Sequence, residues 1–208
     1  MRPDPRPRRF RLALSSLLLG LAALPVQAAP ATYNVDRAHS SVGFEVRHFF
    51  NDVPGRFTDF DGQVIYDPES VGDSRIELVV KTESIDTDLE RRDQHLRSGD
   101  FFDAETHPEL SFRSTHVAAG EAENQLRVTG DLTIRGKTQR LTVPVEILGL
   151  MELGDGAAKA AFQTEFVIDR QAFDVKWNRQ LDNGGTVLGN EVRIRVVLQL
   201  DRVVKTEG

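Results

Sequence analysis

Apolar and polar residues alternate along most of this chain, and that period of two restricts the fold more than any other feature. Val42, Phe44 and Val46 share one face of the first such segment. Alternation of this kind is typical of half-buried strands, whose successive side chains point to opposite faces. About eight strands are predicted, at residues 41–49, 57–66, 76–81, 110–112, 126–134, 141–147, 160–168 and 192–200.

Short turns join many of these segments. Arg135-Gly136-Lys137 predicts a tight hairpin with glycine in the left-handed conformation, and Gly154-Asp155-Gly156 predicts another turn. Residues 51–55 are predicted as a turn because they contain Pro54, and Pro144 indicates an edge or a bulge. Hairpins without a βαβ rhythm favour an antiparallel sheet that closes on itself. We therefore expect an all-β fold, an eight-stranded antiparallel barrel that holds side chains or one slender ligand.

One segment departs from the alternation and predicts a short inserted α-helix over about residues 87–98. Thr87 and Glu90 have the spacing of a capping box, in which each side chain satisfies an amide of the first turn. Gly99 offers a left-handed stop, and Arg97 lies in the last turn near the carbonyl ends. The paired aromatics Phe101-Phe102 follow directly.

The charges of this helix suggest catalysis at first sight. Asp93, His95 and Arg92 have the chemistry of an acid, a base and an anion clamp. The chain has no cysteine, however, and no serine lies in a nucleophile-elbow motif. Asp93 and Arg97 are four residues apart, so a solvated helix with ordinary side-chain pairing explains the charges. We therefore predict a protein that is not an enzyme.

The five histidines are the candidate metal ligands of the chain. They fall in separate segments without HxH or HxxxH spacing, so no metal site is predicted. They are His39, His48, His95, His107 and His116.

The first 28 residues have the pattern of a secretory signal peptide. Five arginines precede an apolar stretch, Leu12 to Leu24, that is too short to span a bilayer. Val26-Gln27-Ala28 places small residues before a cleavage at Ala29. Residues 29–208 then form a single domain, and we expect it in the periplasm, with an uncleaved anchor as the alternative.

The charge of the mature chain bears on its partners. Removing the five Arg and one Asp of the leader leaves 21 basic and 31 acidic residues, a formal net charge of −10. Such a surface repels nucleic acid and anionic membrane faces, so neither nucleic-acid binding nor stable membrane insertion is expected. Without cysteines, the domain depends on its core alone even in an oxidising compartment.

Phenylalanine dominates the aromatic residues, with twelve Phe against one Trp and two Tyr. Periodicity alone leaves two alternatives open, because the interior of an eight-stranded barrel can be fully packed or can hold a ligand. The excess of apolar rings without polar handles favours a cavity.

Ordered motifs run through the whole mature chain. The most distinctive block comprises Ser84 to Thr87, Arg92 to Ser98 and Phe101 to Asp103; the others are Ser40 to His48, Val53 to Gly62, Gly130 to Gly136, Ile168 to Phe173, Trp177-Asn178, Gly184-Gly185 and Gly189 to Val192. In this order the motifs resemble the YceI-like family, over residues 32 to about 200. Two positions depart from the family pattern: Asp174 stands where glycine is expected, and Asn190 stands where aspartate is common.

The resemblance implies an extended, lipocalin-like barrel in a secreted, usually periplasmic, bacterial protein. It also implies a hydrophobic tunnel that binds a polyisoprenoid chain, that of a quinone or a polyprenyl phosphate, without any required cofactor. Family members are not generally enzymes. We expect the tunnel to be lined by Phe44, Val46, Phe57, Phe60, Ile76, Leu78, Phe101, Phe102, Leu132, Ile134, Phe162, Phe166 and Ile168.

The lipid head group is expected to meet Arg91, Arg92 or His95 if the helix borders the mouth of the tunnel. The net charge of −10 favours a neutral quinone head unless those arginines reverse the field locally. A lipid-ester hydrolase and a ligand-free barrel for stress-related interactions are the alternatives. Exposed edge strands would permit a homodimer without requiring one.

Overall fold

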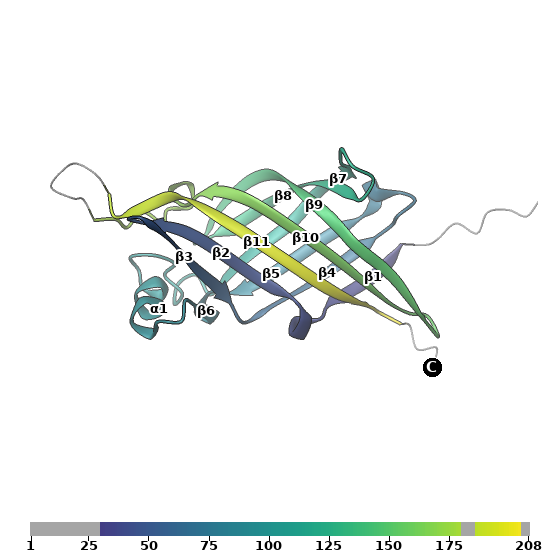
Figure 1. Cartoon of the computed structure of the whole chain (residues 1–208), viewed down its shortest axis with the longest axis horizontal. Coiled ribbons are helices and arrows are strands. Elements are labelled where there is room, and N and C mark those ends of the chain that lie inside the picture. The colour runs from purple at the N-terminus through teal and green to yellow at the C-terminus, as the bar shows by residue number, and fades with distance from the viewer. Residues whose placement is uncertain (1–29, 180–185, 205–208) are drawn as a thin grey trace, which may run out of the picture.

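The computed structural model describes residues 30–179 and 186–204, which form one closed β-sheet with a short α-helix at one end (Figure 1). The eleven strands of this sheet are β1 (Ala31–Val35), β2 (Ser41–His48), β3 (Asn51–Phe57), β4 (Phe60–Tyr66), β5 (Arg75–Lys81), β6 (Ile85–Asp86), β7 (Glu109–Ala119), β8 (Gln125–Ile134), β9 (Lys137–Gly154), β10 (Ala157–Asp169) and β11 (Leu188–Arg202). The helix is α1 (Glu90–Arg97), and 3-10 helices lie at Arg37–His39, Val71–Asp73, Thr82–Ser84 and Arg170–Phe173.

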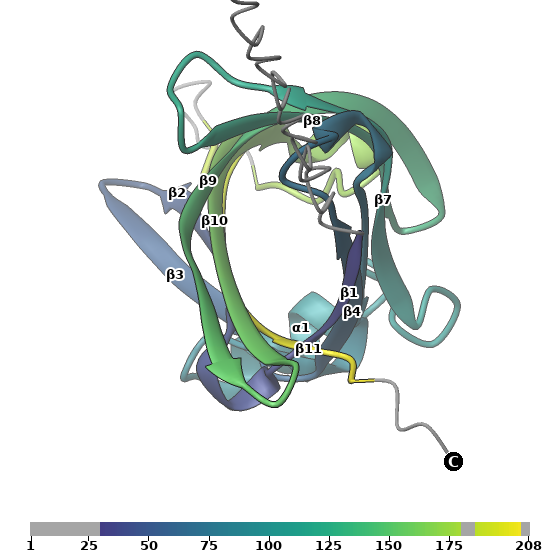
Figure 2. The same cartoon turned by 90° about the vertical axis from the view of Figure 1, so that its right-hand side faces the viewer.

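The eleven strands occupy eight positions around the barrel (Figure 2). β1 and β2 form one interrupted barrel strand, because both pair with β11, at Val35↔Leu200 and at Phe44↔Ile194. β3 with β4, and β5 with β6, are interrupted in the same way. The β1–β11 pairing closes the ring, and every ladder is antiparallel. The predicted eight-stranded antiparallel barrel is confirmed.

The alternation in the sequence sets the two faces of the wall. On β8, Leu126, Val128, Leu132 and Ile134 are buried on the inside, while Arg127 is exposed. Each buried methylene contributes roughly 0.8 kcal/mol to the stability of such an interior. Closure also leaves few free strand edges. The homodimer, which was expected to use such edges, stays a prediction.

Two of the predicted turns are confirmed and one is wrong. Arg135 and Gly136 have φ of 48° and 69°, which gives a two-residue β8–β9 hairpin, and residues 154–156 also have positive φ. Residues 51–55, predicted as a turn, belong to β3, and the chain reverses at Phe49 and Phe50 instead. β3 tolerates Pro54 because that residue pairs only with β2; the other neighbour, β6, begins to pair at Arg56.

Pro144 lies where the β9–β10 ladder stops, so the predicted edge is confirmed. The ladder runs from Ala157↔Gly154 to Gln163↔Glu146 and does not continue to Pro144, which has no N–H to donate. Beyond the end of this ladder, the Thr164 hydroxyl of β10 donates to the Pro144 carbonyl oxygen at 2.6 Å.

The inserted helix is confirmed, but its ends differ from the prediction. α1 begins after Leu89, and no side chain caps it, so the predicted capping box is wrong. Thr87 instead donates from its amide and its hydroxyl to the carboxylate of Asp93, which is 4% exposed. The Asp93–Arg97 pair is also wrong, because Arg97 donates to the carbonyl oxygens of Glu83 and Ile85 at 2.8 and 2.9 Å.

The predicted left-handed stop at Gly99 is wrong as well. Ser98 is the C-cap with φ of −70°, and Gly99 is not among the described glycines with positive φ. The chain after α1 folds back on the helix, so the amides of Phe102 and Ala104 donate to the carbonyl oxygens of Leu96 and Arg97. These bonds satisfy the helix end without a glycine conformation.

Candidate functional site

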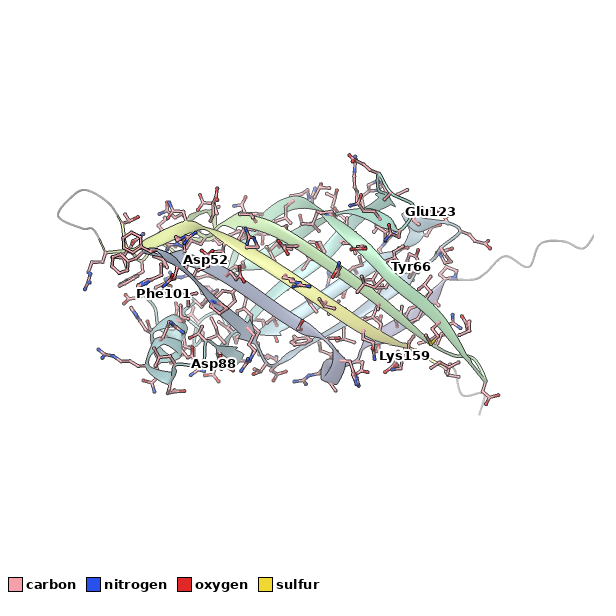
Figure 3. The ribbon with its side chains drawn as sticks, in the orientation of Figure 1. Asp52, Tyr66, Asp88, Phe101, Glu123 and Lys159 are labelled. Carbon is pink, nitrogen blue, oxygen red and sulfur yellow. The ribbon has the colours of Figure 1, made fainter. Side chains whose placement is uncertain are left out.

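The barrel encloses an apolar cavity of about 650 Å³, within the range of ligand-binding pockets. Inward side chains of strands all around the ring form its wall, and the α1 segment borders it through Leu89, Arg91 and Leu96. Figure 3 shows Phe101 at the α1 end of the barrel and Tyr66, another lining residue, nearer the opposite end. The open alternative between a packed barrel and a hollow one is therefore decided in favour of a cavity.

Most residues predicted for the tunnel lie around this cavity. The exception is Phe60, which is 4% exposed and packs in the core without reaching the lining. Contact between these residues and a lipid stays a prediction. The predicted residues found in the wall are Phe44, Val46, Phe57, Ile76, Leu78, Phe101, Phe102, Leu132, Ile134, Phe162, Phe166 and Ile168.

Some lining residues were not in the predicted set. Val42, Val128 and Leu198 share a face with predicted positions, so the alternation contained the signal for them. Phe112 lies in a strand that was predicted too short to show its periodicity. Trp177 lies outside regular strands, so no alternation marks it, and its only sequence signal was the Trp177-Asn178 motif.

An aromatic cluster forms the wall next to α1. The ring centroid of Trp177 lies 5.0 Å from that of His95 and 5.1 Å from that of Phe101. Phe102 faces Phe57 edge-on at 6.1 Å. The Phe101-Phe102 pair after the helix therefore points into the cavity and holds α1 against the barrel.

The three residues predicted to meet a head group also border the cavity at this end. Arg92 is fixed by Thr87, whose hydroxyl and carbonyl oxygens accept from Nε and Nη2 at 2.6 Å each. The Nε2 atom of His95 lies 2.9 Å from a carboxylate oxygen of Asp100. Arg91 is exposed on one side and lines the cavity on the other.

The segment that leads into α1 is tied to β3 by charge. The guanidinium of Arg56 contacts the carboxylates of Asp86 at 2.6 Å and Asp88 at 3.1 Å. The backbone amide of Asp88 and the guanidinium of Arg56 hold the pKa of Asp86 below its usual range. Asp88 itself has φ of 60°, so the chain turns sharply here before the helix begins.

Arg170 is a functional candidate that the sequence reasoning missed. It lines the cavity and is 5% exposed. Its Nε donates to the Gly189 carbonyl oxygen, and its Nη1 donates to those of Val175 and Trp177, at 2.7–2.9 Å. Burial lowers the pKa of the Arg170 guanidinium from its ordinary value. Its only sequence signal was a place in the motif at 168–173.

Two kinds of functional group were candidates in the sequence, metal ligands and a hydroxyl–histidine pair. Within residues 30–179 and 186–204, no group of three or more acidic or histidine side chains could hold a metal ion. In the same ranges, no serine or threonine hydroxyl bonds to a histidine ring nitrogen. No helix of this part of the chain has the length and apolar character to cross a membrane.

Comparison with known proteins places the chain in a family. The YceI-like domain model matches residues 33–200. A UPF0312 protein of Vibrio parahaemolyticus is 37% identical over 156 residues, which cover 74% of this chain and 82% of the relative. The chain belongs to the YceI-like family. A UPF0312 protein of Pseudomonas aeruginosa is 32% identical over 172 residues, covering 80% of this chain and 88% of its own.

Solved structures share the barrel of this YceI-like protein. BcnA of Burkholderia cenocepacia superposes with a TM-score of 0.69 at 29% identity, covering 79% of this chain and 98% of BcnA. A polyisoprenoid binding domain from Saccharophagus degradans, implicated in plant cell wall breakdown, gives a TM-score of 0.61 at 16% identity, covering 83% and 99% of the two chains. At that identity the likeness concerns the fold.

Proposed function

We propose that this protein binds a long-chain isoprenoid lipid, of the quinone or polyprenyl type, and sequesters or carries it. The observation behind the proposal is the apolar cavity of about 650 Å³, which is walled by inward Phe, Leu, Ile and Val side chains. The fold shared with a polyisoprenoid binding domain supports an isoprenoid over other apolar ligands. The role is binding rather than catalysis.

The physical basis is the transfer of a hydrocarbon tail from water to the cavity. Each buried methylene contributes roughly 0.8 kcal/mol. Ordering a flexible tail and losing its translational freedom offset much of that gain, so the affinity falls well below the area sum. The rings of Phe57, Phe102 and Trp177 already pack against other rings, so ordering these side chains on binding adds little to the entropic cost.

The compartment follows from residues 1–28, which lie outside the described residues. We propose that they direct export and are removed, so that residues 29–208 act in the periplasm. A water-filled compartment between two membranes is where an enclosed carrier for an apolar lipid is useful, because the free lipid is insoluble there.

The test is to identify the lipid that the protein retains from its own cell. The protein is purified without detergent, extracted with organic solvent, and the extract is analysed by mass spectrometry. An isoprenoid lipid in roughly stoichiometric amount is expected. An extract without isoprenoids would overturn the proposal.

Two variants at neighbouring positions locate the binding site. Val46 lines the cavity, whereas Glu45 points to the outside of β2. Val46→Trp narrows the cavity and should reduce the amount of retained lipid, while Glu45→Trp should leave it unchanged. Equal lipid content in both variants would contradict binding inside the barrel.

A further inference from the structure

We infer that the cavity selects a lipid with a negatively charged head group, a phosphate or a carboxylate, and that Arg170, Arg91 and Arg92 bind this group. The inference rests on the proposed lipid-binding function and names the class of its ligand. It reverses the expectation of a neutral head group that the net charge gave.

The first observation is the sign of the charges in the cavity wall. The whole chain has 32 acidic and 26 basic residues. The charged side chains that line the cavity are nevertheless Arg91, Arg92 and Arg170, and no described aspartate or glutamate lines it. The formal charge of the cavity wall is therefore positive within an acidic protein. Low-dielectric walls strengthen the attraction of these arginines for an anion, because they screen charge less than water does.

The second observation is the environment of Arg170, which is 95% buried. Three carbonyl oxygens and the amide oxygen of Asn190, at 3.3 Å from Nη2, accept its hydrogen bonds. These neutral acceptors satisfy donors, but they do not cancel the charge. Among the described residues no carboxylate forms an ion pair with Arg170, and Asp169 attracts it only at longer range. A buried cation without an opposite charge is costly, so a bound anion would stabilise it.

Asn190 is the residue that leaves this charge open. Its amide oxygen lies 3.3 Å from Nη2 of Arg170, so an aspartate at this position would lie against the guanidinium. In this chain the amide oxygen of Asn190 instead serves both Arg170 and the Nε2 of Gln171. An amide at this position leaves the cavity wall one charge more positive than a carboxylate would.

The third observation is that the three arginines lie at one end of the cavity. Arg170 bonds to the Trp177 carbonyl oxygen, the Trp177 ring packs on His95, and His95 shares α1 with Arg91 and Arg92. Along β11, Gly189 contacts Arg170, whereas Leu198 lines the apolar part nine residues further on, roughly 30 Å along the strand. A head group at the α1 end and a tail along the barrel match this division.

The acidic residues near α1 do not fill this role. Asp93 is buried against Thr87, and Asp100 lies beside His95; neither lines the cavity. Arg92 uses Nε and one Nη2 hydrogen for Thr87, which leaves its Nη1 hydrogens for a ligand. Arginine presents a planar set of donors that suits phosphate and carboxylate oxygens.

The experiment compares lipids that differ only in the head group. Delipidated protein is titrated with geranylgeranyl phosphate and with geranylgeraniol, and separately with oleate and with oleyl alcohol. We expect the phosphate, the carboxylate or both to bind about tenfold more tightly than the matched alcohol, about 1.4 kcal/mol. A stronger preference for the phosphate would indicate a polyprenyl phosphate as the ligand, and a stronger preference for oleate would indicate a fatty acid.

Three variants assign the preference to the arginines. Asn190→Asp places a carboxylate beside Arg170 and should reduce the preference for the anion to about twofold or less, with the affinity for the alcohol unchanged. Arg91→Gln with Arg92→Gln should act in the same direction and leaves the Arg170 turn intact. Arg193→Gln, on the outside of β11 and paired with Glu45, is the matched control and should change neither affinity.

The outcomes are distinct for the two proposals. Equal affinity for anion and alcohol in the wild type overturns the charged head group and leaves lipid binding in place. An anion preference that survives both Asn190→Asp and the double arginine variant also overturns it. Failure to bind any of the four lipids overturns the proposed function itself.

Discussion

The roles of Asp93 and Arg170 depend on hydrogen-bond partners that the sequence pattern does not indicate. Asp93 has the spacing of a solvated partner for Arg97, yet it is buried and accepts two hydrogen bonds from Thr87. Arg170 has no local pattern that reveals a buried cation, because its acceptors come from residues 175, 177 and 189. Most lining residues on the strands were predictable, since strand parity places them, whereas Trp177 lies outside the strands.

Removing the Asp93 carboxylate tests its structural role. Asp93→Ala leaves the amide and hydroxyl of Thr87 without an acceptor, so the free energy of unfolding should fall by about 1–3 kcal/mol. Glu90→Ala, on the exposed side of the same helix, should stay within about 0.5 kcal/mol of the wild type. Urea denaturation measures both, and equal losses would contradict the role.

Phe102 offers a test of the cavity wall at the α1 end. Phe102→Ala removes the ring that faces Phe57 and lines the cavity, so the affinity for geranylgeraniol should fall about tenfold. Phe50→Ala is the control, because Phe50 is 91% exposed at the β2–β3 turn and does not line the cavity. Fluorescence or calorimetric titration gives both affinities. An unchanged affinity in Phe102→Ala would mean that the Phe101-Phe102 segment supports the fold without contacting the lipid.

Secondary-structure elements were predictable where local chemistry decides them and not where tertiary contacts do. The hairpin at Arg135-Gly136 follows from a turn that needs two positive φ values. The start of α1 was not predictable, because Thr87 turns to Asp93 instead of capping the helix. The strand over residues 51–57 was hidden by Pro54, which fits only because the strand is mostly unpaired on one side.

The β8–β9 turn gives a matched pair of glycine substitutions. In Gly136→Ala, the new Cβ would lie 2.9 Å from His107 Cε1 in a residue with φ of 69°, so a loss of about 1 kcal/mol or more is expected. Gly99→Ala meets nothing within 4 Å and has no positive φ, so its stability should be unchanged or slightly higher. A large loss in Gly99→Ala would mean that Gly99 does adopt a left-handed conformation.

The bridge between β3 and the α1 segment predicts a dependence on acid. Because the folded-state pKa of Asp86 is lowered from 3.8, its contribution to stability is present above that value and is lost as pH falls through the folded pKa. In Asp86→Asn this part of the acid dependence should be absent. Urea midpoints at about pH 7 and about pH 3 should therefore differ less in the variant than in the wild type. Equal differences would show that the ionised carboxylate of Asp86, with its bonds to the Asp88 amide and Arg56, contributes nothing to this acid dependence.

At the scale of the whole molecule, closure of the barrel creates both the core and the cavity. A wall built from eight strand positions leaves an interior that its own side chains do not fill. In the ligand-free protein, the side chains that face this cavity therefore lack the van der Waals contacts of a packed core. The net charge of the chain gave no guide to this interior, because none of the described aspartates and glutamates lines the cavity, whereas Arg91, Arg92 and Arg170 do.

Ligand binding should therefore stabilise the whole barrel. A ligand that binds only the folded state at about 100 times its Kd adds about 2.7 kcal/mol to the free energy of unfolding. Protein stripped of lipid should melt at a lower temperature than protein reloaded with geranylgeraniol. Val46→Trp, which narrows the cavity, should show a smaller increase. A similar increase in Val46→Trp would place the stabilising lipid outside the barrel.

The central claim is that a lipid tail occupies the inside of the barrel. A crystal structure of the protein incubated with geranylgeraniol tests it most directly. Continuous density is expected from the side of Phe101, Phe102 and Trp177 along the barrel toward Tyr66 and Leu198. An empty cavity with the lipid bound on the outer surface would contradict the claim.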